Sequence, residues 1–263
     1  MKKLLLLFIL IALFVPAIAA QSAWDGTWKI DFSKANFPKK PDVFLLQNGM
    51  YECKTCSPAY KIKADGTDQP VTGHPYFDSI AIKVVDDRTI EETDKKGGKV
   101  VATSKVTASP DGKTVTFEFT DSSNTNGGAP VTGKGTATQV AKGPAGSHAI
   151  SGSWRTNQIS DISDNGITWT YNVSGNELTM TAATGQSFTA KLDGTEAPMK
   201  GDPGVTSVSV KMLGKNTLEE TDKRDGKVIG IGKTTLEADG KSLKIIYEDK
   251  LRNTKADYVA VKQ

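Results

Sequence analysis

Apolar and polar residues alternate along much of this chain with a period of two. The apolar positions of three such segments are Val115, Phe117 and Phe119; Ile80, Ile82 and Val84; and Ile167, Trp169, Tyr171 and Val173. This period is typical of strands with one buried face. Turn pairs such as Asn48-Gly49 and Gly97-Gly98 separate the segments and tolerate the positive φ angles of tight hairpins. No amphipathic helix is predicted after residue 20, so the pattern indicates an all-β protein.

The phrase TIEETDKKGGKV at 89–100 returns as TLEETDKRDGKV at 217–228. A shift of 128 positions aligns residues 60–121 with 188–249 without a gap, and 24 of these 62 pairs are identical. Such self-similarity at a fixed period indicates an internal duplication. We therefore predict two tandem domains, at residues 21–142 and 150–263.

Each repeat is predicted to contain about eight strands joined by hairpins. Closing such strands into an antiparallel meander β-barrel would leave no exposed sheet edge. A sandwich of two sheets is the alternative architecture.

Residues 1–20 have the three parts of a secretory signal peptide. Lys2 and Lys3 precede an apolar run at 4–15, which is shorter than the ~20 residues of a membrane-spanning helix. Small residues place the cleavage site after Ala19 or Ala20. We therefore predict a signal helix, export to the periplasm or the extracellular medium, and no stable membrane insertion after cleavage.

The charges of the chain are nearly balanced. Its formal net charge is +3, and loss of Lys2 and Lys3 with the signal peptide lowers this to +1. Lysines are interspersed with Asp and Glu instead of forming a basic stripe, so nucleic acid is not a predicted partner. The sequence leaves the oligomeric state open.

Cys53 and Cys56 are the only cysteines of the chain. In an exported protein we expect them to form a disulfide. Three residues of extended strand span about 10 Å, whereas a disulfide requires Cα atoms within about 7 Å, so the chain must turn between them. A small structural staple is favoured over a redox-active pair, because no βαβ pattern surrounds it. Ser57 stands where haem attachment would require histidine.

The repeated EETDK phrase supports two interpretations. If Ile90 faces inward, then Glu92 and Asp94 share its face. Two such carboxylates could hold a cation or lie at a barrel mouth. The favoured interpretation is a hairpin arm with solvated charges, which Lys95 and Lys96 pair.

Other catalytic or metal-binding signals are weak. His74 and His148 are too few for a metal cluster and are expected in exposed loops. No nucleophile motif or phosphate-binding loop is present. We therefore predict no catalytic residue, no metal site and no cofactor.

Both repeats open with Gly-x-Trp, at 26–28 and at 152–154. A strand that begins this way and opens an eight-stranded meander resembles the lipocalin and fatty-acid-binding (calycin) barrels. The resemblance implies a small apolar ligand inside the barrel. It also implies that the first-strand tryptophan plugs one end beneath a late arginine, for which Arg252 is the candidate in the second repeat.

The repeats differ at the two cysteines, at residues 74–77 and in the long loop at 121–134, so a ligand site is expected where the first repeat has these features. The candidate ligand-binding residues are Trp28, His74, Tyr76, Phe77, Phe117, Phe119, Trp154, Trp169 and Tyr171. We predict an exported, non-enzymatic protein that binds a small apolar ligand. The alternatives are a structural or interaction protein of the cell envelope with side-chain-filled barrels, and a thiol-redox or hydrolytic enzyme.

Overall fold

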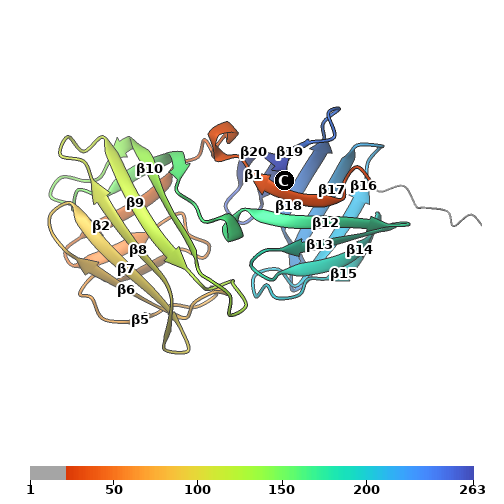
Figure 1. Cartoon of the computed structure of the whole chain (residues 1–263). Coiled ribbons are helices and arrows are strands. Elements are labelled where there is room, and N and C mark those ends of the chain that lie inside the picture. Colours follow the sequence, from red (N-terminus) through yellow and green to blue (C-terminus); the bar gives the residue numbers. More distant parts are fainter. Residues whose placement is uncertain (1–21) are drawn as a thin grey trace, which may run out of the picture.

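The computed structural model describes residues 22–263, which form two antiparallel, barrel-like sheets (Figure 1). Two short 3-10 helices, η1 (Phe32–Lys34) and η2 (Asp164–Gly166), lie between strands. Within the described range, no helix is long and apolar enough to cross a membrane. The predicted all-β class is confirmed, whereas the predicted signal helix at 1–20 lies outside the described residues.

Barrel 1 is the sheet that contains most strands of the first repeat. Its ten strands, in spatial order, are β4 (Tyr60–Lys63), β3 (Met50–Cys53), β2 (Asp42–Gln47), β11 (Gly152–Ser160), β10 (Val131–Lys142), β9 (Thr114–Asp121), β8 (Lys99–Ala108), β7 (Thr89–Lys96), β6 (Ser79–Val84) and β5 (Gln69–Pro70).

Barrel 2 contains most strands of the second repeat. Its ten strands, in spatial order, are β14 (Ser187–Lys191), β13 (Glu177–Ala182), β12 (Thr168–Ser174), β1 (Gly26–Ile30), β20 (Thr254–Lys262), β19 (Ser242–Asp249), β18 (Lys227–Leu236), β17 (Thr217–Arg224), β16 (Ser207–Met212) and β15 (Asp193–Pro198).

The two repeats exchange their first strands. Strand β1 lies between β12 and β20 of barrel 2, where Trp28 is opposite Trp169 and Lys262. Strand β11 lies between β2 and β10 of barrel 1, where Trp154 is opposite Asp42. Figure 1 shows β1, in red, inside the cyan and blue sheet. Each barrel is therefore completed by a strand of the other repeat, a feature that the predicted contiguous segments 21–142 and 150–263 do not include.

Tight turns set the register of the hairpins. Asn48 and Gly49 join β2 to β3 with φ angles of 53° and 73°. Gly97 and Gly98 join β7 to β8 with φ angles of 55° and 77°. Two successive positive φ angles are the geometry that matches the right-handed twist of paired strands. Local sequence therefore determines which strands become neighbours.

Each barrel is nearly closed by short contacts at the edges of its sheet. In barrel 2, Ser187 of β14 and Lys200, just beyond β15, exchange backbone hydrogen bonds of 3.0 and 2.8 Å. In barrel 1, β4 and β5 are the two edge strands, and Asp65, just beyond β4, forms a bridge with Lys83 of β6. Nearly closed barrels therefore replace the alternative of a sandwich.

Each barrel has its own hydrophobic core. Ile80, Ile82 and Ile90 are fully or almost fully buried in barrel 1. Leu178 and Leu243 are fully buried in barrel 2. These residues occupy the apolar positions of the two-residue period, so the alternation of the sequence reports which side chains face inward.

Candidate functional site

Barrel 1 contains an interior cavity of about 350 Å³, which is lined in part by residues of its hydrophobic core. Aromatic and aliphatic side chains form most of the lining: Phe44, Tyr51, Tyr60, Ile90, Val106, Val115, Phe117, Ala137, Ile150 and Trp154. Its polar lining comes from Asp42, Ser104, Thr156 and Glu92. A mostly apolar concave space with a few polar groups is the usual form of a small-molecule site.

A tryptophan anchors the end of each barrel. The Trp154 indole donates a hydrogen bond to the Ile150 carbonyl at 2.8 Å, and the Trp28 indole donates one to the Trp24 carbonyl at 2.9 Å. Both indoles are buried. Lys262 lies over the Trp28 ring, 5.0 Å from its centroid. Arg252, the expected arginine cap of the second repeat, contacts Asp42 of barrel 1, the residue opposite Trp154 of the second repeat.

Arg252 joins barrel 2 to the cavity end of barrel 1. Its guanidinium pairs with the Asp42 carboxylate, and its Nε donates to the Thr55 carbonyl at 3.3 Å. Lys40 Nζ donates to the Arg252 carbonyl at 2.6 Å. The ion pair compensates the charge of Asp42, one of the two carboxylates that line the cavity.

Cys53 and Cys56 form a disulfide beside the same cavity. Their Cα atoms are 5.5 Å apart, so the chain turns between them as predicted. Cys53 is fully buried in the barrel 1 core, and Cys56 lines the cavity. The pair holds the chain that follows β3 against the cavity wall.

The carboxyl groups of Glu92 and Asp94 face the interior of barrel 1. They alternate with Glu91 and Thr93, which face outward, and they continue the face of the buried Ile90. Both are partly buried, and Glu92 lines the cavity. The favoured prediction of a hairpin arm with solvated charges is therefore wrong for these two residues.

Burial destabilises the ionised forms of this pair. Burial raises the pKa of Glu92 well above its usual range, and the neighbouring Asp94 charge raises it further. Burial, followed by the charge of Asp121, likewise raises the pKa of Asp94. The buried Oδ1 of Asp94 has no hydrogen-bond partner among the described residues. Burial thus favours the protonated forms of both carboxyl groups, and barrel 1 supplies no hydrogen-bond partner for Asp94 Oδ1 among the described residues.

Barrel 2 has the equivalent pair, Glu220 and Asp222, with a different environment. The Tyr247 hydroxyl donates to Asp222 Oδ2 at 3.1 Å. Burial raises the pKa of both carboxyl groups, while hydrogen bonds from Tyr247 and Glu220 partly offset the rise for Asp222. The position of Tyr247 in the first repeat is Phe119, which has no hydroxyl. Only barrel 2 therefore supplies a donor from this position.

Small residues determine where each of these rings lies. A Cβ atom at Gly230 would lie 2.1 Å from the Tyr247 hydroxyl, so the phenol occupies space above β18. The first repeat has Ala102 at that position. Its Phe119 ring instead covers Gly133 on β10, where a Cβ atom would lie 2.7 Å from the ring. The Phe119 ring consequently lies away from the neighbouring β8, on which Ala102 pairs with Asp94 of β7.

Barrel 2 has a smaller and more exposed hollow of about 240 Å³. Trp169, Tyr171 and Met180 line it together with Glu220. The Trp169 indole N–H is buried without a partner among the described residues. Trp169 occupies the register position of Asp42, because each is opposite the first-strand tryptophan of its barrel. An indole thus fills space in barrel 2 where barrel 1 has a short carboxylate.

The segment at 74–77 lies at the junction between the barrels. The Tyr76 hydroxyl donates to Asp202 Oδ1 at 2.9 Å, and Asn124 donates to Asp202 Oδ2 at 3.0 Å. The His74 ring stacks on Phe77 at 4.6 Å between centroids. The expectation of an exposed loop histidine is wrong for His74, since its Nε2 is buried without a partner in the described structure.

His148 is also held by backbone contacts. Its Nε2 lies 2.6 Å from the Asp86 carbonyl, and its Nδ1 accepts a hydrogen bond from the Ile150 amide at 3.3 Å. The residue therefore orders the approach to β11 next to the cavity-lining Ile150.

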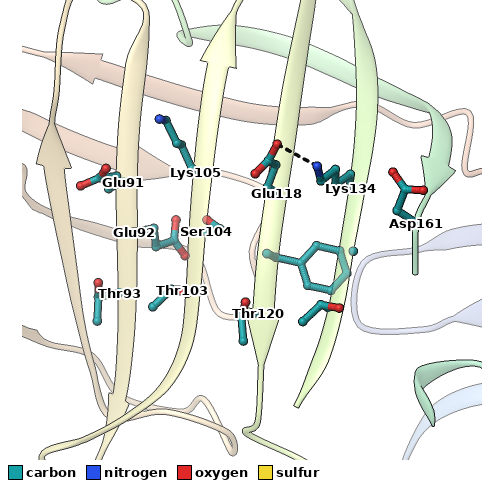
Figure 2. A pocket seen from close by; sticks show the side chains of 13 residues that line it. Glu91, Glu92, Thr93, Thr103, Ser104, Lys105, Glu118, Thr120, Lys134 and Asp161 are labelled. Carbon is teal, nitrogen blue, oxygen red and sulfur yellow. Dashed lines mark ion pairs between the residues drawn. The ribbon is translucent and has the colours of Figure 1, made fainter. Parts of the chain in front are cut away.

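A hollow of about 490 Å³ lies on the outer face of barrel 1 (Figure 2). Glu91, Lys105, Glu118 and Lys134 are directly opposite one another across β7 to β10. Lys134 Nζ lies 3.5 Å from Glu118 Oε1. Two positions further along the strands, the next row on this face consists of threonines: Thr93, Thr103, Thr120 and Thr132. This polar, exposed wall does not provide the apolar enclosure that the interior cavity provides.

The structure separates the nine candidate ligand-binding residues into distinct groups. Phe117 and Trp154 line the barrel 1 cavity, whereas Trp169 and Tyr171 line the barrel 2 hollow. Trp28 is fully buried in the barrel 2 core. Phe119 faces the barrel 1 interior, and His74, Tyr76 and Phe77 lie toward the junction.

Two polar groups of the cavity, Asp42 and Ser104, were not predicted from the sequence. For Glu92, an inward position that could hold a cation or lie at a barrel mouth was the less favoured interpretation, and a hairpin arm with solvated charges was the favoured one. The available signal was the two-residue period, which places Glu92 on the face of Ile90.

Metal chemistry has no support in the geometry of residues 22–263, because no group of three or more His, Cys, Asp or Glu side chains is placed to hold an ion. Comparison with known proteins adds no assignment: the chain matches no family model, and no curated protein matches it significantly.

Proposed function

We propose that barrel 1 is a binding module that holds one small, largely apolar molecule in its interior cavity. The observation that supports this proposal is the cavity of about 350 Å³ with mostly aromatic and aliphatic walls. Displacing water from such walls favours binding by about 25 cal/mol for each Å² of apolar surface buried. In this proposal, barrel 1 holds its ligand inside the barrel, as the resemblance of the Gly-x-Trp openings to lipocalins implies.

The proposed role is non-enzymatic and belongs to an exported protein. The predicted signal peptide and the Cys53–Cys56 disulfide both support a periplasmic or extracellular location. Barrel 2 takes the role of a structural partner in this proposal, because Trp28 and Phe188 occupy its core and its hollow, of about 240 Å³, is smaller and more exposed. A purely structural or interaction role for both barrels is the competing function.

Binding of the neutral dye N-phenyl-1-naphthylamine separates the two functions. We expect saturable binding with one site per chain, measured by the rise in dye fluorescence. The Val106→Phe variant, which adds a ring to the cavity wall, should weaken dye binding at least tenfold. Lys105→Gln is the matched control, since Lys105 is the adjacent residue on the outer face.

Absence of saturable dye binding to the wild-type protein would support the structural role instead. Equal binding by Val106→Phe and the wild type would place the dye outside the cavity and contradict the proposal. Native mass spectrometry of protein from its producing cells provides a second measurement, in which a bound small molecule should add a fixed mass.

A further inference from the structure

We propose that the molecule held in barrel 1 carries a protonated amine that pairs with the Glu92 carboxylate. This inference rests on the proposed binding function and specifies the chemistry of its ligand. It follows from the charges of the cavity wall, from the unsatisfied carboxyl pair beside it, and from the contrast with barrel 2.

The cavity wall carries acidic groups without an equal number of basic ones. Asp42 and Glu92 line the cavity, and no Lys, Arg or His among the described residues does so. Arg252 compensates Asp42. Glu92 makes no hydrogen bond or ion pair with another described residue, and its largest charge interaction is with Asp94, which is also acidic. The remaining uncompensated group at the cavity is therefore the Glu92 carboxyl.

Buried polar groups in folded proteins almost always have partners, because an unpaired one costs about 1–3 kcal/mol. The carboxyl pair of barrel 2 has such a partner, since the Tyr247 hydroxyl donates to Asp222 Oδ2 at 3.1 Å. Barrel 1 departs from it, since Phe119 replaces the tyrosine and the buried Asp94 Oδ1 has no partner in the described structure. A donor brought by a ligand to Glu92, the member of the pair that lines the cavity, would compensate the barrel 1 pair as Tyr247 compensates the barrel 2 pair through Asp222.

The aromatic walls also suit an organic cation. Phe44, Tyr51, Tyr60 and Trp154 all line the cavity that Glu92 borders. Aromatic faces attract ammonium groups, by up to about 2 kcal/mol where water is excluded. A metal ion fits less well, because residues 22–263 offer no set of three ligands. The combination of rings with one free carboxyl therefore favours an ammonium group on an apolar body.

The titratable groups that surround Glu92 favour a cation over an anion. Asp94, Tyr51 and Tyr60 are the groups that interact most closely, and burial raises the pKa of each of them. None of them supplies a positive charge. An ammonium group would permit the carboxyl pair to ionise, whereas a carboxylate ligand would add a further negative charge.

The direct test compares three head groups on the same apolar body by isothermal titration calorimetry in an amine-free buffer at pH 7. The first series is tryptamine, tryptophol and indole-3-acetate, and the second is octylamine, octanol and octanoate. We expect the amine of at least one series to bind at least tenfold more tightly than its alcohol. The carboxylate should bind most weakly.

Variants then locate the interaction. Glu92→Gln should reduce amine affinity at least tenfold and leave alcohol affinity unchanged. Glu220→Gln, which changes the equivalent carboxyl of barrel 2, and Glu91→Gln, which changes the adjacent outward-facing residue, are matched controls that should retain full amine affinity. If Glu92→Gln fails to fold, the head-group comparison tests the amine preference and Glu220→Gln tests its place, because loss of amine affinity in that variant would overturn the assignment to Glu92.

The outcomes distinguish this inference from the function on which it rests. Saturable dye binding without any preference for amines in either series overturns the amine proposal and leaves the binding function intact. Absence of binding by the dye and by both series overturns both proposals. Amine binding that Glu92→Gln leaves unchanged but Glu220→Gln abolishes would move the site to barrel 2 and overturn the assignment to Glu92.

Discussion

The two barrels contain the same interior carboxyl pair in different surroundings. In barrel 2, the Tyr247 hydroxyl donates to Asp222 at 3.1 Å. In barrel 1, the equivalent ring is Phe119, which leans over Gly133 and leaves Asp94 Oδ1 without a donor in the described chain. A duplicated sequence has thus produced one interior carboxyl pair with a donor from its own barrel and one without.

The difference depends on equivalent positions at which the two repeats carry different residues. Gly230 makes room for the Tyr247 phenol next to Asp222, whereas Ala102 occupies that position in barrel 1. The barrel mouths differ as well, because Trp169 of barrel 2 corresponds in register to Asp42 of barrel 1. The aromatic side chains of barrel 2 therefore leave a hollow of about 240 Å³, smaller than the cavity of about 350 Å³ in barrel 1.

The largest expected effect tests which barrel each first strand supports. Trp28→Ala should destabilise barrel 2 by about 3–5 kcal/mol, because a fully buried indole is removed. Hydrogen exchange, measured by mass spectrometry, should accelerate in β12 and β20. Dye binding to barrel 1 should persist.

Trp154→Ala is the matched variant for barrel 1. It should accelerate exchange in β2 and β10 and weaken dye binding, because Trp154 lines the cavity. If Trp28→Ala instead accelerates hydrogen exchange in β2 and β10, then β1 belongs to barrel 1 in solution, and each barrel is built from its own repeat.

The second prediction concerns the space that Tyr247 occupies. Gly230→Ala would place a Cβ atom 2.1 Å from the Tyr247 hydroxyl. Overpacking and displacement of a hydrogen bond should together cost about 2–4 kcal/mol. Urea unfolding monitored by tryptophan fluorescence measures the loss.

Gly232→Ala provides the control on the same strand. Its added Cβ would meet its nearest atom, on the Tyr247 ring, at an ordinary 3.7 Å. We expect a change smaller than about 1 kcal/mol. If the two variants lose the same free energy of unfolding, the position of the Tyr247 ring is not the reason that Gly230 is required.

Much of the fold could be predicted because its signals are local. The two-residue alternation and the Asn-Gly and Gly-Gly turns determine the hairpins, and the register of 128 residues reveals the duplication. The exchange of β1 and β11 could not be predicted, because both strands open with the same Gly-x-Trp pattern and offer similar inward faces to either barrel. Their position depends on where the connections at 31–41 and 161–167 lead, and periodicity carries no information about that.

The candidate site was predicted less completely for a different physical reason. Alternation from Ile90 placed Glu92 and Asp94 on the inward face, but charged side chains are rarely buried, so solvated charges were favoured. The residues unique to the first repeat, at 74–77, contribute instead to the junction through Asp202. The site also depends on a contact between neighbouring strands that periodicity does not predict, because the Phe119 ring of β9 covers Gly133 of β10.

The third prediction removes the donor from barrel 2. Tyr247→Phe should leave the Glu220–Asp222 pair as unsatisfied as its barrel 1 equivalent, at a cost of about 1–3 kcal/mol in unfolding free energy. Because the phenol stabilises ionised Asp222, its loss should raise the pKa of that carboxyl further, and the cost should be larger at pH 8 than at pH 6.

Tyr258→Phe is the matched control for this variant. Tyr258 lies on β20 and makes no side-chain hydrogen bond among the described residues, and burial alone raises its pKa. Its removal should cost less than about 1 kcal/mol and show no dependence on pH in this interval. A Tyr247→Phe variant that behaves like Tyr258→Phe would remove the distinction between the two carboxyl pairs.

The smallest expected effect is the pH dependence that Glu92 gives to the ligand-free protein. Its pKa is raised in the folded state, so the folded protein holds more protons than the unfolded chain once the pH exceeds the ordinary carboxyl range near 4.3. The free energy of unfolding should therefore fall as the pH rises from 5 to 8. Glu92→Gln resembles the protonated form and cannot ionise, so its stability should fall by about 1–2 kcal/mol less over this interval. The measurement is urea unfolding in amine-free buffer at each pH. Glu91→Gln, at the exposed neighbouring position, should reproduce the wild-type dependence of the unfolding free energy on pH. If this dependence is the same in all three proteins, Glu92 is not the buried, uncompensated carboxyl that separates barrel 1 from barrel 2.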